Sequence, residues 1–195
     1  MGRRVLLLLA AAALAAGAAA PAADVFDFIP EGGRTLLAKA LAGRPANDPA
    51  RALVSGKHTR DEWLAYLRGE AKALPGVREL DEKQATTLAD YLAHNMPLPA
   101  GKAPSSPALA NWQKALPPDG RDLALEHCQS CHIITVVITQ DRAKAQWLGT
   151  MNKPSHVQIK ITTAQRDALA DYLVLNAGIP IDQVPEELRA GGATY

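Results

Sequence analysis

The sequence predicts a mainly α-helical protein built from two similar helical domains in tandem. Alanine, leucine and charged residues dominate the chain, and most of them have high helix propensity. The one β-branched run, at 133–139, is too isolated to form a sheet. Residues 87–99 and 168–180 read TLADYLAHNMPLP and ALADYLVLNAGIP, so ADYL, an asparagine and a final proline recur at matching positions. Self-similarity of this kind is typical of an internal repeat.

The first residues of the chain predict an export signal. Arg3 and Arg4 precede an apolar run at 5–20, and an Ala-x-Ala follows at 20–22. This is the layout of a secretory signal peptide. The run is short for a membrane span, which needs about 20 residues. We therefore expect residues 1–23 to be a cleaved signal peptide and the mature protein to be periplasmic; an uncleaved N-terminal anchor is the alternative.

Composition and charge limit the kinds of partner. Removal of the leader takes away two positive charges and changes the formal charge from +1 to −1. A nearly neutral chain does not favour nucleic acid as a partner. No second apolar stretch is long enough to cross a bilayer, so we expect no stable membrane span after signal cleavage.

Each repeat is expected to close with a helix, over 82–95 and 163–176. Just before the two helices, an Asp or Thr stands three residues ahead of a Gln, at Asp81 and at Thr162. Such a pair can satisfy the free N–H groups at a helix start.

Two further matches lie upstream in the same order. Gly33-Arg34 matches Gly120-Arg121, and Trp63 matches Trp147. Matching residues are 87 positions apart at Gly-Arg, 84 at Trp and 81 at Asp-Tyr-Leu, so only short deletions separate the two repeats. We expect a first domain at 24–98, a linker rich in Pro, Ala and Ser at 99–117, a second domain at 118–181 and a tail at 182–195.

Both cysteines of the chain lie in one motif, Cys128-Gln129-Ser130-Cys131-His132. Residues 41–45 of the first repeat, LAGRP, fall opposite it, so the motif occurs once. The motif could be a redox dithiol, half of a metal site or an attachment site for c-type haem. A structural zinc site needs four ligands, and no second cysteine pair exists. A redox dithiol usually begins a helix, whereas residues 120–127 are expected to form a helix that runs into the motif.

The haem interpretation uses every residue of the motif. Cys128 and Cys131 would form thioethers to the porphyrin, and His132 would bind the iron. Export agrees with this interpretation, because c-type haem is attached outside the cytoplasm. We expect one haem c per chain.

The second half, about 119–180, resembles a class I cytochrome c domain. The similarity covers an opening helix that ends in CxxCH, a helix that carries a tryptophan and a closing helix with Asp-Tyr-Leu. It implies a small helical shell around one haem, with the first and last helices crossing. It also implies Cys128 and Cys131 as covalent attachment sites and His132 as the proximal iron ligand. The first half resembles the same domain without its haem motif.

Two features of that family are missing. Many members carry Gly-Pro-x-Leu soon after CxxCH, and its proline carbonyl accepts the N–H of the proximal histidine, a bond that orients the ligand. Here residues 133–140 contain no proline, and the second half has no distal Met-Pro loop.

Two residues are candidates for the sixth iron ligand, Met151 and His156. Met151 lies four residues after Trp147, on the same face if the helix continues. Short-loop members of the family place a methionine shortly after such a tryptophan, which favours Met151. His156 follows Pro154, beyond the expected helix end. Met151 could instead be a core residue, and His156 a surface residue. Methionine ligation would raise the reduction potential, and two histidines would lower it.

These expectations describe a periplasmic monohaem c-type cytochrome that transfers single electrons. The expected partner is a redox protein, such as a periplasmic dehydrogenase subunit upstream and a cytochrome or oxidase downstream. We expect an electron-transfer protein or an oxidoreductase subunit rather than a catalyst on its own. The alternatives are a haem protein whose open or displaceable sixth site binds a small ligand or acts on a substrate, and a thiol protein without haem.

Overall fold

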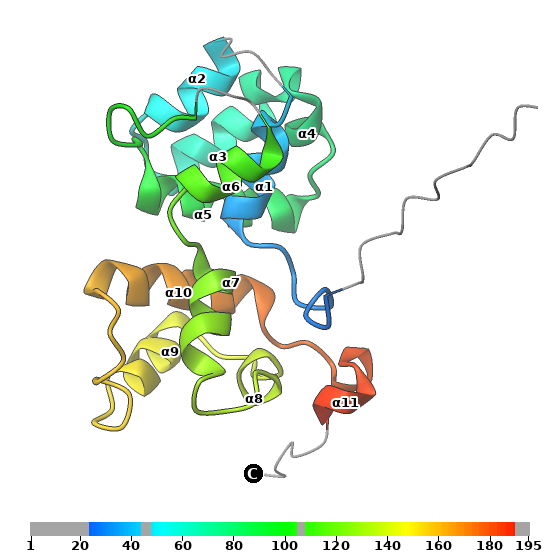
Figure 1. Ribbon diagram of the computed structural model, residues 1–195, viewed down its shortest axis with the longest axis vertical. Helices are drawn as coiled ribbons and strands as arrows, with labels where there is room; N and C mark the ends of the chain where they lie inside the picture. The colour runs from blue at the N-terminus through cyan, green and yellow to red at the C-terminus, as the bar shows by residue number, and fades with distance from the viewer. Residues whose placement is uncertain (1–23, 44–47, 105–107, 190–195) are drawn as a thin grey trace, which may run out of the picture.

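The computed structural model describes residues 24–43, 48–104 and 108–189. These residues form helices joined by loops and contain no β-strand, which confirms the mainly α prediction. The expected signal peptide and the end of the tail lie outside them. The helices form two groups, one above the other in Figure 1, and each group surrounds a separate hydrophobic core. No helix of the described residues is long and apolar enough to cross a membrane.

The first group surrounds a core of leucines and alanines together with Trp63, Tyr91 and Trp112. Its helices are α1 (Gly33–Leu41), α2 (Asp48–Ser55), α3 (Arg60–Arg68), the short 3₁₀ helix η1 (Glu70–Ala73), α4 (Pro75–Arg78), α5 (Glu82–Asn95) and α6 (Leu109–Ala115).

The second group surrounds a smaller core that contains Trp147, Met151 and Tyr172. Its helices are α7 (Gly120–Leu123), the π-helical turn η2 (Ala124–Cys128), α8 (Thr135–Ile138), α9 (Lys144–Met151), α10 (Thr163–Asn176), η3 (Ile181–Gln183) and α11 (Glu186–Arg189).

The closing helices α5 and α10 have the bounds that the sequence predicts, and a capping box starts each of them. Before α5, Asp81 Oδ1 accepts from the Gln84 N–H at 2.8 Å. Before α10, Thr162 Oγ1 accepts from the Gln165 N–H at 3.1 Å. In both boxes the glutamine side chain accepts in return from the cap residue's own N–H. Both starts are therefore set by local side chains, as expected.

In each group the opening helix meets the closing helix at a glycine. A Cβ placed on Gly33 of α1 would lie 2.1 Å from Tyr91 Cβ of α5. A Cβ placed on Gly120 of α7 would lie 2.1 Å from Tyr172 Cβ of α10. Only glycine allows the helices to approach so closely. Because the two contacts join corresponding positions of the two repeats, they support the internal repeat.

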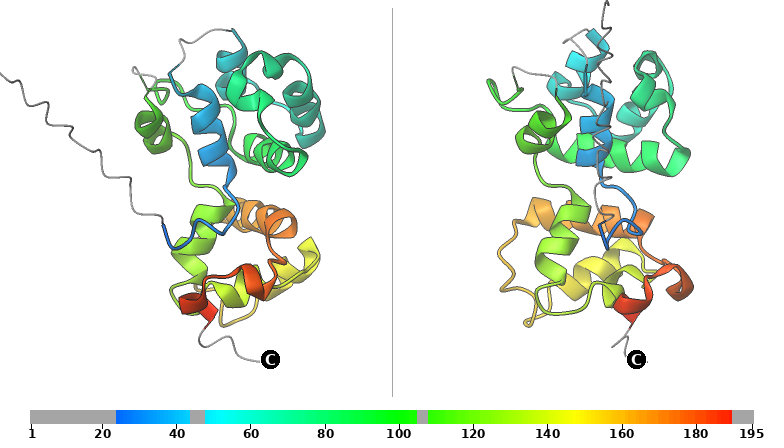
Figure 2. Two further views of the ribbon diagram at one scale, coloured as in Figure 1. Left: turned by 90° about the vertical axis from the view of Figure 1, so that its right-hand side faces the viewer. Right: turned by 45° about the vertical axis from the view of Figure 1, so that its right-hand side comes forward.

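Both ends of the first group differ from the expected boundaries. The expected linker contains α6, and its buried residues Trp112 and Leu116 belong to the first core. Upstream, Ile29 is buried in the second core, and Phe26 and Phe28 pack against it. Figure 2 shows this segment running beside the second group before it enters α1. Burial of these apolar side chains explains both differences.

The two groups meet through corresponding residues. The Tyr91 hydroxyl donates to the Pro117 carbonyl at 2.8 Å, and the Tyr172 hydroxyl donates to the Pro30 carbonyl at 2.6 Å. Pro30 and Pro117 precede Gly33 and Gly120 by the same three residues. Each tyrosine thus contacts the same element of the opposite group, as in a symmetric dimer interface.

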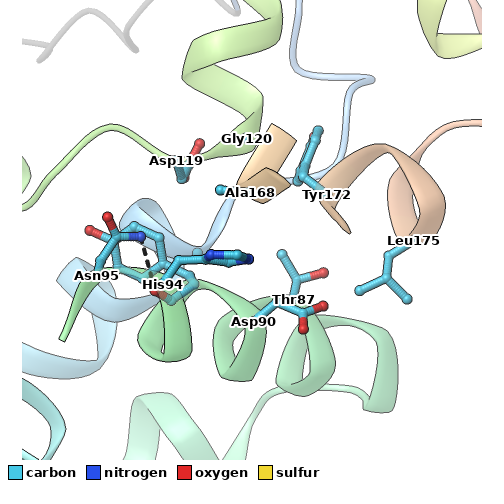
Figure 3. Close-up of a pocket in the computed structure, with 11 residues that line it drawn as sticks. Thr87, Asp90, His94, Asn95, Asp119, Gly120, Ala168, Tyr172 and Leu175 are labelled. Atoms are coloured by element: carbon cyan, nitrogen blue, oxygen red, sulfur yellow. Dashed lines mark hydrogen bonds between the residues drawn. The ribbon is translucent and has the colours of Figure 1, made fainter. Parts of the chain in front are cut away.

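A small pocket of about 20 Å³ lies between the closing helices. Side chains of α5 and α10 meet there, together with Asp119, as Figure 3 shows. The pocket has room for about one water molecule. It is too small for an organic ligand, so we treat it as part of the interface.

Candidate cofactor site

All five residues that the sequence singles out line one cavity of the second group, with a volume of about 360 Å³. The five are the motif residues Cys128, Cys131 and His132 and the two distal candidates Met151 and His156. The volume lies within the range of about 300–1,000 Å³ that is usual for small-molecule sites. Apolar side chains form most of the remaining wall: Val137, Trp147, Ile159, Ile161, Leu169 and Leu173.

A helix delivers the cysteine motif to this cavity. Asp119 caps the start of α7 by accepting from the Asp122 N–H at 3.0 Å. The helix then continues through the π-helical turn η2, which ends at Cys128. The Cys128 carbonyl accepts from the N–H of His132 at 3.1 Å, which closes the motif into a single turn. The cysteines therefore lie at the C-terminal end of a helix, as the sequence predicts.

The Cys128 thiol does not have the character of a reactive redox cysteine. Burial, with Cys131 close by, raises the pKa of Cys128 to about 11. Reactive cysteines instead have a lowered pKa, because the thiolate is the nucleophile. The Cys128 thiol is protonated at neutral pH, and neither cysteine is in a disulfide.

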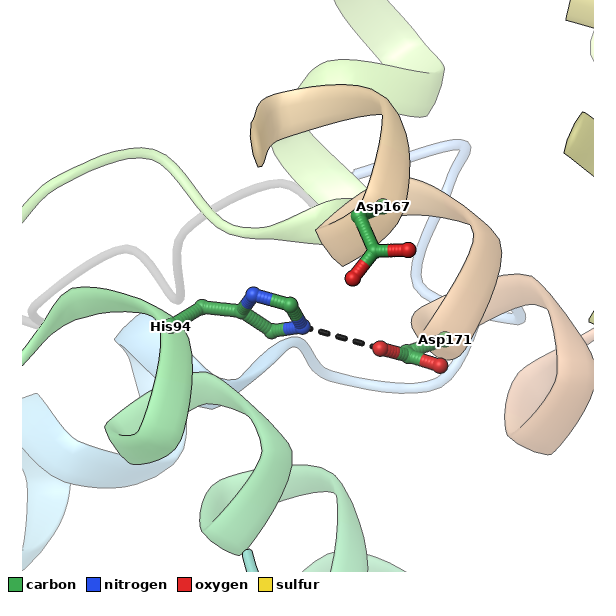
Figure 4. A group of neighbouring side chains, drawn as sticks. All are labelled: His94, Asp167 and Asp171. Carbon is green, nitrogen blue, oxygen red and sulfur yellow. Dashed lines mark hydrogen bonds and ion pairs between the residues drawn. The ribbon is translucent and has the colours of Figure 1, made fainter. Parts of the chain in front are cut away.

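A metal site built from the motif alone is not supported either. Among the described residues, only His94, Asp167 and Asp171 bring three potential ligand atoms within 4.8 Å of one another (Figure 4). This group lies between α5 and α10, where Lys144 Nζ is 3.0 Å from Asp167 Oδ1 and 2.8 Å from Asp171 Oδ1. The lysine ammonium already supplies the positive charge there. We interpret the group as an ion-pair network between the helix groups.

The electrostatics of that network agree with this interpretation. Burial alone would raise the pKa of Asp171, but hydrogen bonds from His94 and Lys144 hold this pKa below its ordinary value. His94 Nε2 lies 2.8 Å from Asp171 Oδ2 and so joins the first group to the second. No local pattern in the chain pairs these residues, because they are 77 positions apart.

Helix α9 carries Trp147 and Met151 into the cavity wall. Both side chains are buried, and Met151 is the last residue of the helix. The indole N–H of Trp147 is buried and has no hydrogen-bond partner among the described residues. A buried unpaired donor costs about 1–3 kcal/mol. The indole N–H groups of Trp63 and Trp112 in the first helix group share this feature, so it does not mark the cavity.

His156 lies on the loop after α9 and faces the same cavity as His132. The centroids of the two imidazole rings are 6.2 Å apart, and the ring planes differ by 32°. His156 Nδ1 is 3.1 Å from the hydroxyl oxygen of Ser155, so this nitrogen already has a partner. No hydrogen bond to the ring of His132 is found among the described residues.

Arg166, for which the sequence predicts no role, holds in place the segment 152–160 that follows α9, here called the distal loop. Its side chain is buried, and its guanidinium donates to the carbonyls of Met151 at 2.7 Å and Ile159 at 3.0 Å. Longer contacts reach the carbonyls of His156 and Val157, at 3.5 and 3.3 Å. One side chain thus fixes the backbone that carries both candidates for the sixth ligand.

Comparisons of this chain with protein-family models, with curated proteins and with solved structures found no match.

Proposed function

We propose that the protein is a monohaem c-type cytochrome that transfers single electrons, as the resemblance of its second half to class I cytochromes c implies. One observation carries the proposal: a single mostly apolar cavity is lined by both cysteines and the histidine of CxxCH and by two further side chains able to bind iron. Cys128 and Cys131 would hold the porphyrin covalently, and His132 would be the proximal ligand.

The cavity suits haem in its polarity as well as in its donor atoms. Its wall offers apolar side chains to the porphyrin. Bound haem supplies a reversible one-electron iron couple. The chain's own residues would fix its position, surround it with apolar side chains and bind the iron from the protein side.

Electron transfer is the role that these side chains favour. Ligand candidates occur both in the motif and on the distal loop, and a haem iron that is bound by the protein on both sides has no free position for a substrate. Cys131 is exposed, so the adjacent edge of a bound porphyrin would be accessible to a partner protein.

The first helix group leaves this edge uncovered. Its helix α5 packs against α10, and Arg34 of α1 contacts Asp119 and Asp122 at the start of α7. The cysteine motif lies at the other end of the helix that begins with α7 (Figure 1). The interface pocket and the cofactor cavity share no lining residue. The first group therefore suits a structural or docking role, and a periplasmic dehydrogenase subunit is the partner that we propose for the electron-donating side.

The proposal is tested by producing the full chain with its leader in a bacterium that matures c-type cytochromes. We expect covalent haem in the periplasmic fraction, at one haem per chain by the pyridine haemochrome assay, with sharp low-spin bands on reduction. The double variant Cys128→Ala and Cys131→Ala should lose the covalent haem. Titratable thiols without a Soret band would overturn the proposal, and a high-spin iron would favour the ligand-binding alternative.

A further inference from the structure

The position of His156 relative to His132 carries an inference that rests on the proposed function and deepens it. An imidazole binds a metal at about 2.0–2.1 Å from its nitrogen, which itself lies about 1.1 Å from the ring centre. Two imidazoles on opposite sides of one iron therefore place their ring centroids about 6.2–6.4 Å apart. The rings of His132 and His156 are 6.2 Å apart.

We propose that His156 is the sixth iron ligand, so that the haem is bound by two histidines. The spacing fits an atom held between the rings. Trp63 and Tyr66, which contact edge to face, also have centroids 6.0 Å apart, but their planes differ by 72°, whereas those of His132 and His156 differ by 32°.

The hydrogen bond of His156 selects the nitrogen that faces the iron. Nδ1 lies 3.1 Å from Ser155 Oγ, so the hydroxyl occupies this nitrogen. Nε2 is left to face a metal, and its lone pair is free in the tautomer in which the Nδ1–H donates to Ser155. A hydrogen bond at the second ring nitrogen is the usual way in which proteins orient a ligating histidine.

The backbone around His156 is held in advance of ligand binding. Arg166 contacts the His156 carbonyl and, more closely, the carbonyls of Met151 and Ile159 on both sides of it. A ligand on a loop that is already ordered loses less conformational entropy when it binds.

Met151 has a sufficient structural role without iron. It is 7% exposed and belongs to the second core with Trp147 and Leu173. Methionine commonly fills gaps in such cores. Ligation by His156 therefore replaces the assignment of Met151 that the family resemblance favours, and it predicts a lower reduction potential than His/Met ligation would give.

The first test is the absorption spectrum of the oxidised full-length holoprotein. We expect a low-spin spectrum without the weak red charge-transfer band that a methionine–iron bond produces. The matched variants are Met151→Leu, which keeps the apolar volume, and His156→Ala, which removes only the loop imidazole. Met151→Leu should leave the spectrum unchanged, whereas His156→Ala should become high-spin and regain the low-spin spectrum when imidazole is added.

A third variant separates ligation from loop packing. Ser155→Ala should stay low-spin, and its reduction potential should rise because the His156 imidazole loses the acceptor that makes it more basic. A red band in the wild type that Met151→Leu abolishes would overturn this inference and leave the proposed function intact. Absence of covalent haem from the wild type would overturn both. The wild-type spectrum and Met151→Leu decide the question even if His156→Ala does not fold.

Discussion

Arg166 places a positive charge within the first four residues of α10, where the helix dipole disfavours a cation. The C-terminal end of helix α9, which lies next to Arg166, explains this position. The carbonyl of Met151, the last residue of that helix, accepts from Arg166 Nη1 at 2.7 Å, so the guanidinium interacts with the negative end of a second dipole. An unfavourable local placement is thus offset by a contact 15 residues away in the chain.

Replacement of Arg166 should loosen the distal loop. Arg166→Met leaves buried carbonyls without donors, and we expect a loss of about 3 kcal/mol in the free energy of unfolding together with a partly high-spin iron. Lys160→Met is the matched control, since it removes the same charge from an exposed position on that loop and should cost less than about 0.5 kcal/mol. Denaturant unfolding and the oxidised spectrum measure the two effects. Equal losses in the two variants would contradict this role of Arg166.

The residues of the site differ in how far the sequence reveals them. CxxCH is a local motif, so Cys128, Cys131 and His132 could be predicted, and the structure brings them into one cavity. The role of Arg166 depends on carbonyls 7 to 15 residues away, and the pairing of His94 with Asp171 spans two helix groups. The only sequence signal for Arg166 is its unfavourable place near a helix start.

At the scale of helices, local signals decide what could be predicted. α5 and α10 begin at capping boxes and carry the repeated ADYL, and their bounds are the expected ones. α6 begins after Ala108, which provides no side-chain cap, and it follows a Pro- and Ser-rich stretch. Burial of Trp112 in the first core stabilises this helix, and such a tertiary contact leaves no periodic pattern in seven residues.

The two glycine contacts predict a sharp contrast among glycine-to-alanine variants. A Cβ at Gly33 or Gly120 would lie 2.1 Å from a tyrosine Cβ, so the crossing helices must separate. Each variant should lose about 2–3 kcal/mol of unfolding free energy, and Gly120→Ala alone should also lower haem incorporation. Gly149→Ala in α9 is the control: nothing lies within 4 Å of its Cβ, and it should gain about 0.5–1 kcal/mol. Circular dichroism during denaturant unfolding measures the stability of all three variants. A Gly33→Ala variant as stable as the wild type would contradict the close contact between α1 and α5.

At the scale of the whole molecule, one carboxylate joins the two helix groups. Asp119 caps its own helix α7, and its Oδ2 also accepts from the Arg34 N–H of α1 at 2.8 Å. The residue at the equivalent cap of α1 is Gly32, where a Cβ would lie 2.0 Å from Asp119 Oδ2. Asp119 therefore caps both opening helices, and the glycine leaves space for it.

This shared cap makes the stability of the molecule depend on pH. Burial, reinforced by the neighbouring Asp122, raises the pKa of Asp119 to about 6. The folded chain then binds a proton at Asp119 that the unfolded chain releases between about pH 4 and 6. The contribution of Asp119 to stability must fall as pH rises through that window, by about 2–3 kcal/mol in total.

The variant Asp119→Asn isolates this contribution, because it removes the titrating group and keeps one acceptor for a cap. Wild type and variant should be unfolded with denaturant as full-length chains at several pH values from 4 to 7. The variant should be less stable throughout, since one of the two capped N–H groups loses its acceptor. The stability advantage of the wild type should be largest near pH 4 and shrink towards pH 7. An advantage that stays nearly level over the same range would show that Asp119 is ionised at pH 4 in the folded chain and that its hydrogen bonds outweigh its burial.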